Sequence, residues 1–140
     1  MYQKDYILRM IEMFGELIAG ILGLIKRGEF IQASDQISRI YYDMLKEDAS
    51  FFRTIPEEEL TRTLLQEHNY TMGHLEILAE LFNTEAELCM AQGNKSGYLE
   101  YSGKSLILFE FIDSEQKIYS LERVNKMETI RKKIDEMKES

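Results

Sequence analysis

One segment of the chain carries the residue types of a phosphate-binding loop. The segment from Gly97 to Ser105 ends in Gly-Lys-Ser, as does the loop whose backbone N–H groups wrap phosphates while its lysine reaches them. That loop needs four residues between its glycines, but five separate Gly97 from Gly103, and no strand is predicted before them. We therefore predict that the chain binds no nucleotide and that Lys104 lies exposed on a helix.

The histidines and the cysteine do not form a recurring metal-binding or nucleophile pattern. His68 and His74 are the only histidines, and neither stands at a metal-ligand spacing such as His-Glu-x-x-His. Cys89 is predicted on the core side of a helix, where a thiol behaves as a small hydrophobe unless a base lowers its pKa. We expect no metal, no cofactor and no catalytic residue, and we expect His74 to be a polar surface residue.

Carboxylates are abundant, but their spacing does not pair them for catalysis. Glu57, Glu58 and Glu59 are neighbours, and neighbours on a helix point in different directions. Four further glutamates are expected to make the outer face of one helix acidic: Glu76, Glu80, Glu85 and Glu87. A di-metal site in a helical bundle needs a Glu-x-x-His motif, which the sequence lacks. The sequence therefore does not indicate an enzyme.

Composition and charge restrict the classes of partner. The 140 residues include 17 Lys and Arg against 25 Asp and Glu, which gives a formal net charge of −8. Nucleic-acid affinity depends on basic contacts to phosphates, so we expect no nucleic-acid partner. The apolar run of the N-terminal segment, residues 17–25, is shorter than the ~20 residues that span a bilayer, so we expect no membrane segment. The single cysteine suits a reducing compartment, and the expected location is the cytoplasm.

Apolar residues that recur three and four positions apart predict six helices and no strand. The expected helices cover about residues 5–27, 29–46, 56–67, 71–92 and 95–112, and the last runs from a capping signal at 113–115 to about 137. Between the second and third helices, Phe51 and Phe52 are expected to fill a gap in the core. The sequence predicts a single all-α domain over residues 1–140.

Two of the expected turns are alike and carry a family resemblance. Residues 26–33 and 91–98 each join two amphipathic segments through one glycine, Gly28 or Gly93, which is expected in the left-handed conformation. With Ala86 at a small position before the second turn, this pattern resembles the tetratricopeptide repeat over about half of the chain. No proline ends either second helix, which departs from that family. The resemblance implies an array of antiparallel helix pairs capped by the last helix.

The opening residues 1–12 are also similar to a family of small uncharacterised bacterial helical proteins, which implies a helical fold and no activity. The tetratricopeptide resemblance implies a non-enzymatic scaffold that holds a protein or peptide in a helical groove. The residues expected to line that groove are Tyr41, Tyr42, Asn83, Tyr98 and Tyr101. For the tyrosines, burial in the core is the alternative.

The first predicted helix has two unusual features. Gly15, Ala19 and Gly23 stack into one stripe, and because glycine costs roughly 1 kcal/mol in a helix, we expect a second helix to approach this stripe closely. The alternative is a ligand groove, which would make the chain a small-molecule sensor or small enzyme with a site between the first and fourth predicted helices. The first helix is also apolar over most of its circumference, through Tyr6, Leu8, Met10, Phe14, Leu17, Leu22 and Leu24. Two or three of these positions should stay uncovered, which predicts a homodimer through this helix.

Overall fold

The structure, a computed structural model, describes residues 2–116 and 119–139, with side chains from Arg9 onward. Its α-helices are α1 (Tyr2–Lys26), α2 (Phe30–Leu45), α3 (Ala49–Arg53), α4 (Leu60–Arg62), α5 (Met72–Ala91), α6 (Lys95–Glu115) and α7 (Leu121–Glu139). No strand occurs in these described ranges, so the all-α prediction is confirmed. The described residues form seven α-helices rather than about six, because the segment around Phe51 and Phe52 is itself the helix α3.

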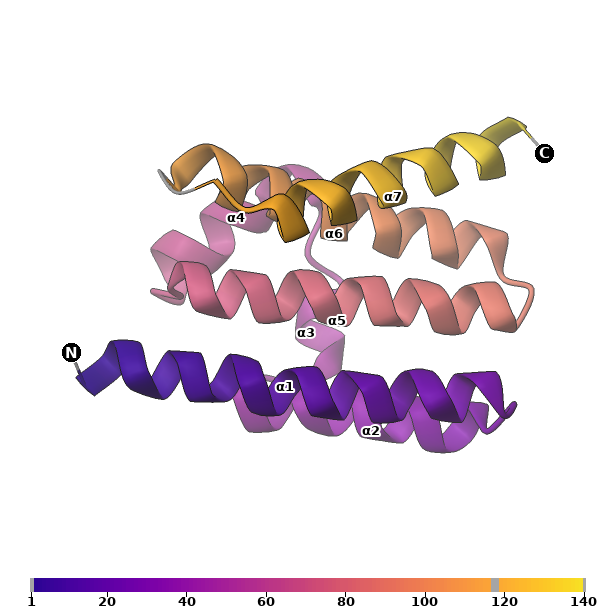
Figure 1. Cartoon of the computed structure of the whole chain (residues 1–140), viewed down its shortest axis with the longest axis horizontal. Coiled ribbons are helices and arrows are strands. Elements are labelled where there is room, and N and C mark those ends of the chain that lie inside the picture. Colours follow the sequence, from indigo (N-terminus) through magenta and orange to yellow (C-terminus); the bar gives the residue numbers. More distant parts are fainter. Residues whose placement is uncertain (1, 117–118, 140) are drawn as a thin grey trace.

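The helices stack in three levels, with α5 in the middle (Figure 1). The antiparallel pair α1 and α2 lies on one side of α5, and α6 lies on the other side with α7 packed on it. An amphipathic helix usually keeps one face in water. Helix α5 contacts α1, α2 and α6 at once, so it buries residues around most of its circumference. Polar side chains on α5 therefore enter the interior or the clefts beside it.

The turns at Gly28 and Gly93 have the same geometry. Both glycines have positive φ, 78° and 76°, as the sequence predicted. After α1, the amide of Gly28 donates to Ile25 O and that of Glu29 to Leu24 O. After α5, Gly93 and Asn94 donate to Met90 O and Cys89 O in the same pattern. This pair of hydrogen bonds defines the Schellman motif, which ends a helix on a left-handed glycine and lets the next helix start at once.

The third predicted helix, residues 56–67, is helical from Glu57 to Glu67 but does not form one regular α-helix. The segment contains a 3₁₀ turn at Glu57–Glu59, the single turn α4, and a π-helical turn at Thr63–Glu67. Leu60 and Leu64 are fully buried in spite of this irregular backbone. Burial of these two leucines anchors the segment to the core, although its helical pitch changes twice.

The predicted role of the phenylalanine pair is confirmed for Phe52. Its ring is fully buried and stacks on Tyr41, with ring centroids 5.3 Å apart. The predicted start of the last helix at 113–115 is wrong, because α6 continues to Glu115 and the next described helix begins at Leu121. Ile112 is fully buried near the end of α6, so this last turn is held by the core rather than ended by the capping signal.

The expected close approach to the glycine stripe of α1 is not found within the described chain. Gly15 and Ala19 are exposed, and a Cβ added at Gly15 would meet no atom within 4 Å. At Gly23, the only described atom that an added Cβ would meet within 4 Å belongs to the side chain of Arg27, four residues further along the chain. The helices that cover α1 use its other face, through Phe14, Ile21 and Ile25.

Candidate functional site

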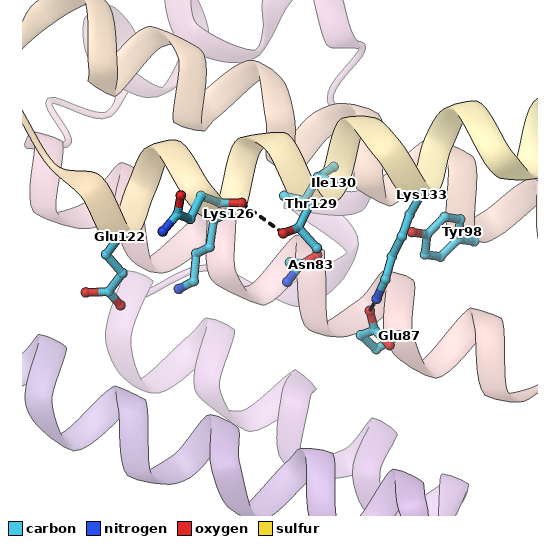
Figure 2. Close-up of a pocket in the computed structure, with 9 residues that line it drawn as sticks. Asn83, Glu87, Tyr98, Glu122, Lys126, Thr129, Ile130 and Lys133 are labelled. Atoms are coloured by element: carbon cyan, nitrogen blue, oxygen red, sulfur yellow. Dashed lines mark hydrogen bonds and ion pairs between the residues drawn. The ribbon is translucent and has the colours of Figure 1, made fainter.

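A polar cavity of about 300 Å³ lies where α7 passes over α5 (Figure 2). We call it the α7 cleft, and it is lined by Asn83, Glu87, Tyr98, Glu122, Asn125, Lys126, Thr129, Ile130 and Lys133. The residues from α7 recur three or four positions apart, which places them on one face of that helix. Asn83 and Glu87 stand one turn apart on α5 and face them, while Tyr98 comes from α6.

The charged side chains of the α7 cleft are largely paired with one another or with their neighbours. Lys133 Nζ lies 3.3 Å from Glu87 Oε1. Lys126 forms an ion pair with Glu80 on α5. Burial lowers the pKa of Lys126, and the nearby Glu76 carboxylate partly opposes that effect. Glu122 also lines the α7 cleft and forms no ion pair within the described chain, so the uncompensated charge of the cleft is negative, which makes it a poor receptor for a phosphate or an acidic peptide.

The carboxamides of Asn83 and Asn125 differ from these paired charges. In the described part of the chain, no hydrogen bond joins either side-chain amide to another group. Thr129 Oγ1 does bond in this region, but it donates to the backbone carbonyl of Asn125, at 2.9 Å. Each carboxamide offers two N–H donors and one carbonyl acceptor. The α7 cleft thus presents two unpaired amides from opposite helices, which suits an uncharged polar group such as a peptide bond.

A second polar group lies deeper, on another side of α5, and we call it the Glu85 cluster: Tyr41, Arg53, Glu85 and Lys104. Arg53 Nε and Nη2 donate to the two carboxylate oxygens of Glu85, at 2.7 and 2.8 Å. Tyr41 Oη donates to the same carboxylate at 3.0 Å. Burial, and then the negative charge of Glu85, raise the pKa of Tyr41. Bidentate pairing of this kind is the strongest common form of charge-assisted hydrogen bond.

The Glu85 cluster corrects two sequence predictions. Glu85 was expected on an acidic outer face, but its side chain is only 6% exposed. Lys104 was expected in solvent, but its side chain is only 4% exposed, and Nζ donates to the backbone carbonyl of Arg53 at 2.8 Å. The physical reason is the same for both: α5 and α6 pack on each other along their whole lengths, so their polar positions face a neighbour instead of water.

The structure does not bring the five predicted groove residues into one groove. Tyr41 is fully buried in the Glu85 cluster, and Tyr101 lies half-buried nearby, with its ring 6.0 Å from that of Phe82. Asn83 and Tyr98 both line the α7 cleft, where burial raises the pKa of Tyr98. Tyr42 is exposed on the opposite side of α2 from the core. Only the pair Asn83 and Tyr98 is placed together in an open site.

The residues considered for nucleophilic chemistry have other roles. His74 is half-buried instead of a simple surface residue, and it completes the N-cap of α5 by accepting from the Thr71 amide at 3.1 Å. Burial lowers its pKa. Cys89 is partly exposed, and burial together with the carboxylates Glu85 and Glu100 raises its pKa, which reduces the thiolate fraction at neutral pH.

Sequence reasoning missed the α7 contribution to the cleft. The last helix was treated as a cap, yet Asn125, Thr129 and Lys133 follow one another at four-residue spacing and mark a polar face. It also missed Arg123, which is buried with Nε and Nη2 on Asp113 Oδ1 at 3.2 and 3.1 Å. The four-residue polar spacing on α7 was the available signal for the cleft. No sequence signal separates the buried Arg123 from its exposed neighbours.

A further cavity, of about 320 Å³, lies between α1, α5 and the start of α7. Its floor is apolar, through Ile11, Phe14 and Ile18, and Glu76 and Lys126 stand at its polar side. Gly15 also lines it, so the glycine stripe borders a cavity at one position rather than a packed helix.

No family model matches this chain, and no curated protein or solved structure gives a significant match to it. The three comparisons therefore assign neither a family nor an activity to this chain, and they supply no related fold. Among the described residues, no helix is long and apolar enough to cross a membrane.

Proposed function

We propose that this chain is a non-enzymatic interaction module of tetratricopeptide-like design, and that its α7 cleft holds an uncharged polar stretch of a partner protein or peptide. The observation that carries the proposal is the pair of carboxamides, Asn83 and Asn125, that have no hydrogen-bonded partner within the described chain, in a cleft whose two lysines are each paired with a glutamate. Asn83 is half-buried, and a half-buried amide without a partner costs free energy, so a ligand that satisfies it gains affinity and specificity. The exposed Asn125 offers a second set of amide donors and an acceptor to the same ligand.

Three further features support this class of function. Two helix pairs, α1 with α2 and α5 with α6, are joined by the same Schellman turn, as expected for repeated helix hairpins. The raised pKa of Cys89 and the lowered pKa of His74 do not suit a thiolate–imidazolium nucleophile. The net charge of −8 disfavours nucleic acid and anionic lipid surfaces as partners. The single cysteine fits a cytoplasmic location, which forms part of the proposal.

Site-specific photo-cross-linking in cells that make the protein naturally tests the proposal. A photo-reactive amino acid at Thr129, on the wall of the α7 cleft, is expected to capture one protein partner, identified by mass spectrometry. The matched control carries the same group at Glu128, the preceding exposed residue, which lies outside the cleft. Capture should be lost when Asn83→Ala is added to the Thr129 probe. Equal products from both positions, or none from Thr129, would argue against a partner in the α7 cleft.

A second function, a small-molecule sensor or small enzyme, is favoured by one specific observation. The cavity of about 320 Å³ lies between α1 and α5, the two helices expected to enclose such a site. A thermal-shift screen of metabolites distinguishes this class, because a ligand that binds only the folded state raises the melting temperature. A rise of several degrees with one compound, abolished by Ile18→Glu in the cavity floor and retained in Asn125→Ala, would favour the sensor. No shift across the screen would leave the protein-binding proposal in place.

A further inference from the structure

The apolar surface of α1 and the face beneath α7 differ in one respect: only the second has an occupant. Of the apolar α1 positions expected to stay uncovered, Leu17 and Leu22 are exposed and Met10, Phe14 and Leu24 are buried, while Tyr6 and Leu8 lie outside the described side chains. The homodimer through this helix stays a prediction. The face beneath α7, by contrast, is covered by α7 itself, so the residues of α7 indicate which chemistry fits that face (Figure 1).

Helix α7 is attached to the helices below it by charges as much as by apolar contacts. Of its apolar side chains, Met127 and Ile130 are buried, and Val124 and Ile134 are partly buried beside them. These residues form a narrow apolar seam along one side of the helix. Four ion pairs accompany the seam, and in each of them α7 supplies the cation: Arg123 with Asp113, Lys126 with Glu80, Arg131 with Glu110, and Lys133 with Glu87.

The charges on the two sides of this contact are complementary. Helix α7 carries six basic and five acidic residues, so the rest of the chain, with 11 basic and 20 acidic residues, has a net charge of −9. Beneath α7 lie Glu80 and Glu87 on α5, and Glu110 and Asp113 on α6, and we call these four residues the acidic face. A helix that fits the acidic face needs an apolar seam with basic residues beside it.

Most of these ion pairs are of the weak, solvent-exposed kind. The side chains of Arg131 and Glu110 are each 48% exposed, and those of Lys133 and Glu87 are 45% and 32% exposed. Pairs with this exposure contribute little to stability, and salt screens them. An outer helix with a narrow apolar seam and screened pairs opens more readily than a central helix such as α5.

Helix α7 is also an imperfect occupant of the acidic face. Glu122, near its start, lines the same cavity as Glu76 and Glu80 of α5. Within the described chain, Glu122 forms no ion pair, so it adds a third carboxylate to that cavity without a cation of its own. Like charges across a contact are unfavourable, and a lysine at the same position of another helix would replace the repulsion with attraction.

We propose that the acidic face is a binding site for a basic amphipathic helix of a partner protein, and that α7 occupies it as a displaceable internal mimic. The partner helix presents apolar residues at the spacing of Met127, Ile130 and Ile134, with basic residues beside them as in α7. This inference does not depend on the ligand of the α7 cleft. A helix that displaces α7 removes the cleft wall that carries Asn125, so the two partners exclude each other.

A labelled peptide of residues 121–139, the sequence of α7, is the probe for the acidic face. Fluorescence anisotropy with the full wild-type chain should show weak binding, because the chain's own α7 competes at a high effective concentration. Ile130→Glu in the chain places a charge in the apolar seam and should release α7. The peptide should then bind at least about 10-fold more tightly. Equal or weaker binding to a folded Ile130→Glu chain would overturn the proposal.

Exchanged charges show whether the peptide uses the acidic face. In the Ile130→Glu chain, the added Glu87→Lys should weaken peptide binding by about 5-fold, and Lys133→Glu in the peptide should restore it. The matched control peptide carries Lys132→Glu, which changes the net charge equally at an exposed residue without an ion pair in the described chain. It should not restore binding. Restoration by both peptides, or by neither, would contradict a site on the acidic face.

Hydrogen exchange of the wild-type chain, measured by mass spectrometry, tests the displacement of α7 without any substitution. The amides of α7 should exchange at least about 10-fold faster than those of the central helix α5. Sodium chloride at about 0.5 M should speed the exchange of α7 further, because screening weakens its ion pairs. Equal protection of α7 and α5 would show that α7 opens only when the whole chain unfolds. That result would overturn the proposal even if the Ile130→Glu chain failed to fold.

Discussion

The Glu85 cluster and the α7 cleft lie on the same central helix, α5, but their polar groups are in opposite states. In the Glu85 cluster, the carboxylate of Glu85 receives two bonds from Arg53 and one from Tyr41. In the α7 cleft, the nearby Asn83 has no hydrogen-bonded partner within the described chain, and the ion pair of Glu87 with Lys133 is partly exposed. Asn83 and Glu85 are only two residues apart on α5, so opposite sides of the same turn carry an unsatisfied polar site and a satisfied one.

This difference indicates different roles for the two regions. A buried carboxylate that keeps all its partners holds elements together: Glu85 ties α5 to α2 through Tyr41 and to α3 through Arg53. Removing one partner would leave the rest buried and unpaired, which is costly. Polar groups that lack partners and lie at a cavity contribute little to the fold and remain available to a ligand. Stability should therefore depend on the Glu85 cluster, and binding on the α7 cleft.

The largest expected effect is the loss of stability in Glu85→Ala. This variant leaves Arg53 and Tyr41 without their acceptor, and we expect the free energy of unfolding to fall by about 3 kcal/mol, the lower end for a broken buried pair because Arg53 keeps some exposure. The control is Glu87→Ala, which removes an exposed ion pair on the same helix and should cost about 0–1 kcal/mol. Urea unfolding of both variants measures the difference. Equal losses would remove the distinction between the two regions.

The same helix shows which parts of the fold the sequence could predict. The three-four spacing of apolar residues predicted α1, α2, α5 and α6, and the glycine turns were predicted at the residues where they occur. Those features depend on local chemistry: periodic burial and the left-handed conformation that glycine tolerates. The changes of helical pitch on either side of α4 were not predicted, because helical pitch there depends on packing and not on residue type.

The burial of charged residues could not be predicted for a different reason. A periodicity argument assigns Glu85 and Lys104 to the outer face because both are polar. Helix α5, however, lies between two other levels of helices and has little outer face, so only the tertiary arrangement decides where Glu85 points (Figure 1). The α7 cleft was also missed, since it forms between helices far apart in sequence. Asn83 was named as a groove residue, but its counterpart Asn125 was not.

The second prediction concerns Lys104, whose ammonium group joins α6 to the end of α3. Lys104→Met keeps most of the side-chain volume but leaves the Arg53 carbonyl without its donor, so we expect a loss of about 1–3 kcal/mol. Lys133→Met in the α7 cleft is the matched change and should stay within about 0.5 kcal/mol, because that lysine is half-exposed. Thermal melts of the two variants measure the two losses of stability. A neutral Lys104→Met would show that the Arg53 carbonyl finds water instead.

The third prediction is a loss of stability at alkaline pH from the tyrosine beside the Glu85 cluster. Burial, and then the charge of Glu85, raise the pKa of Tyr101 from 10.0 to about 12. Below pH 10 both folded and unfolded states keep the proton, and the contribution of Tyr101 to stability is fully present. Between pH 10 and about 12 the unfolded state loses its proton first, so stability falls as the pH rises.

Absorbance titration near the phenolate band, compared between wild type and Tyr101→Phe, gives the contribution of this group as a difference. Burial also raises the pKa of Tyr70 to about 12, so the variant should keep a late phase of smaller amplitude and should lose less stability over the same pH interval. Tyr42→Phe is the control variant, because it removes an exposed phenol on α2. An identical alkaline transition in wild type and Tyr101→Phe would mean that another group controls it.

The smallest expected change in stability is in the α7 cleft itself. Asn125→Ala and Asn83→Ala remove carboxamides that have no partner within the described chain, so each should alter the free energy of unfolding by no more than about 0.5 kcal/mol. Their effect on capture by the cleft probe should nevertheless be large, since the partner loses a hydrogen bond with each amide. A marked loss of stability in either variant would show that these amides support the fold. Unchanged stability with unchanged capture would show that the partner, if it binds there, does not use them. The combination of intact folding and lost capture is the outcome that separates the α7 cleft from the Glu85 cluster.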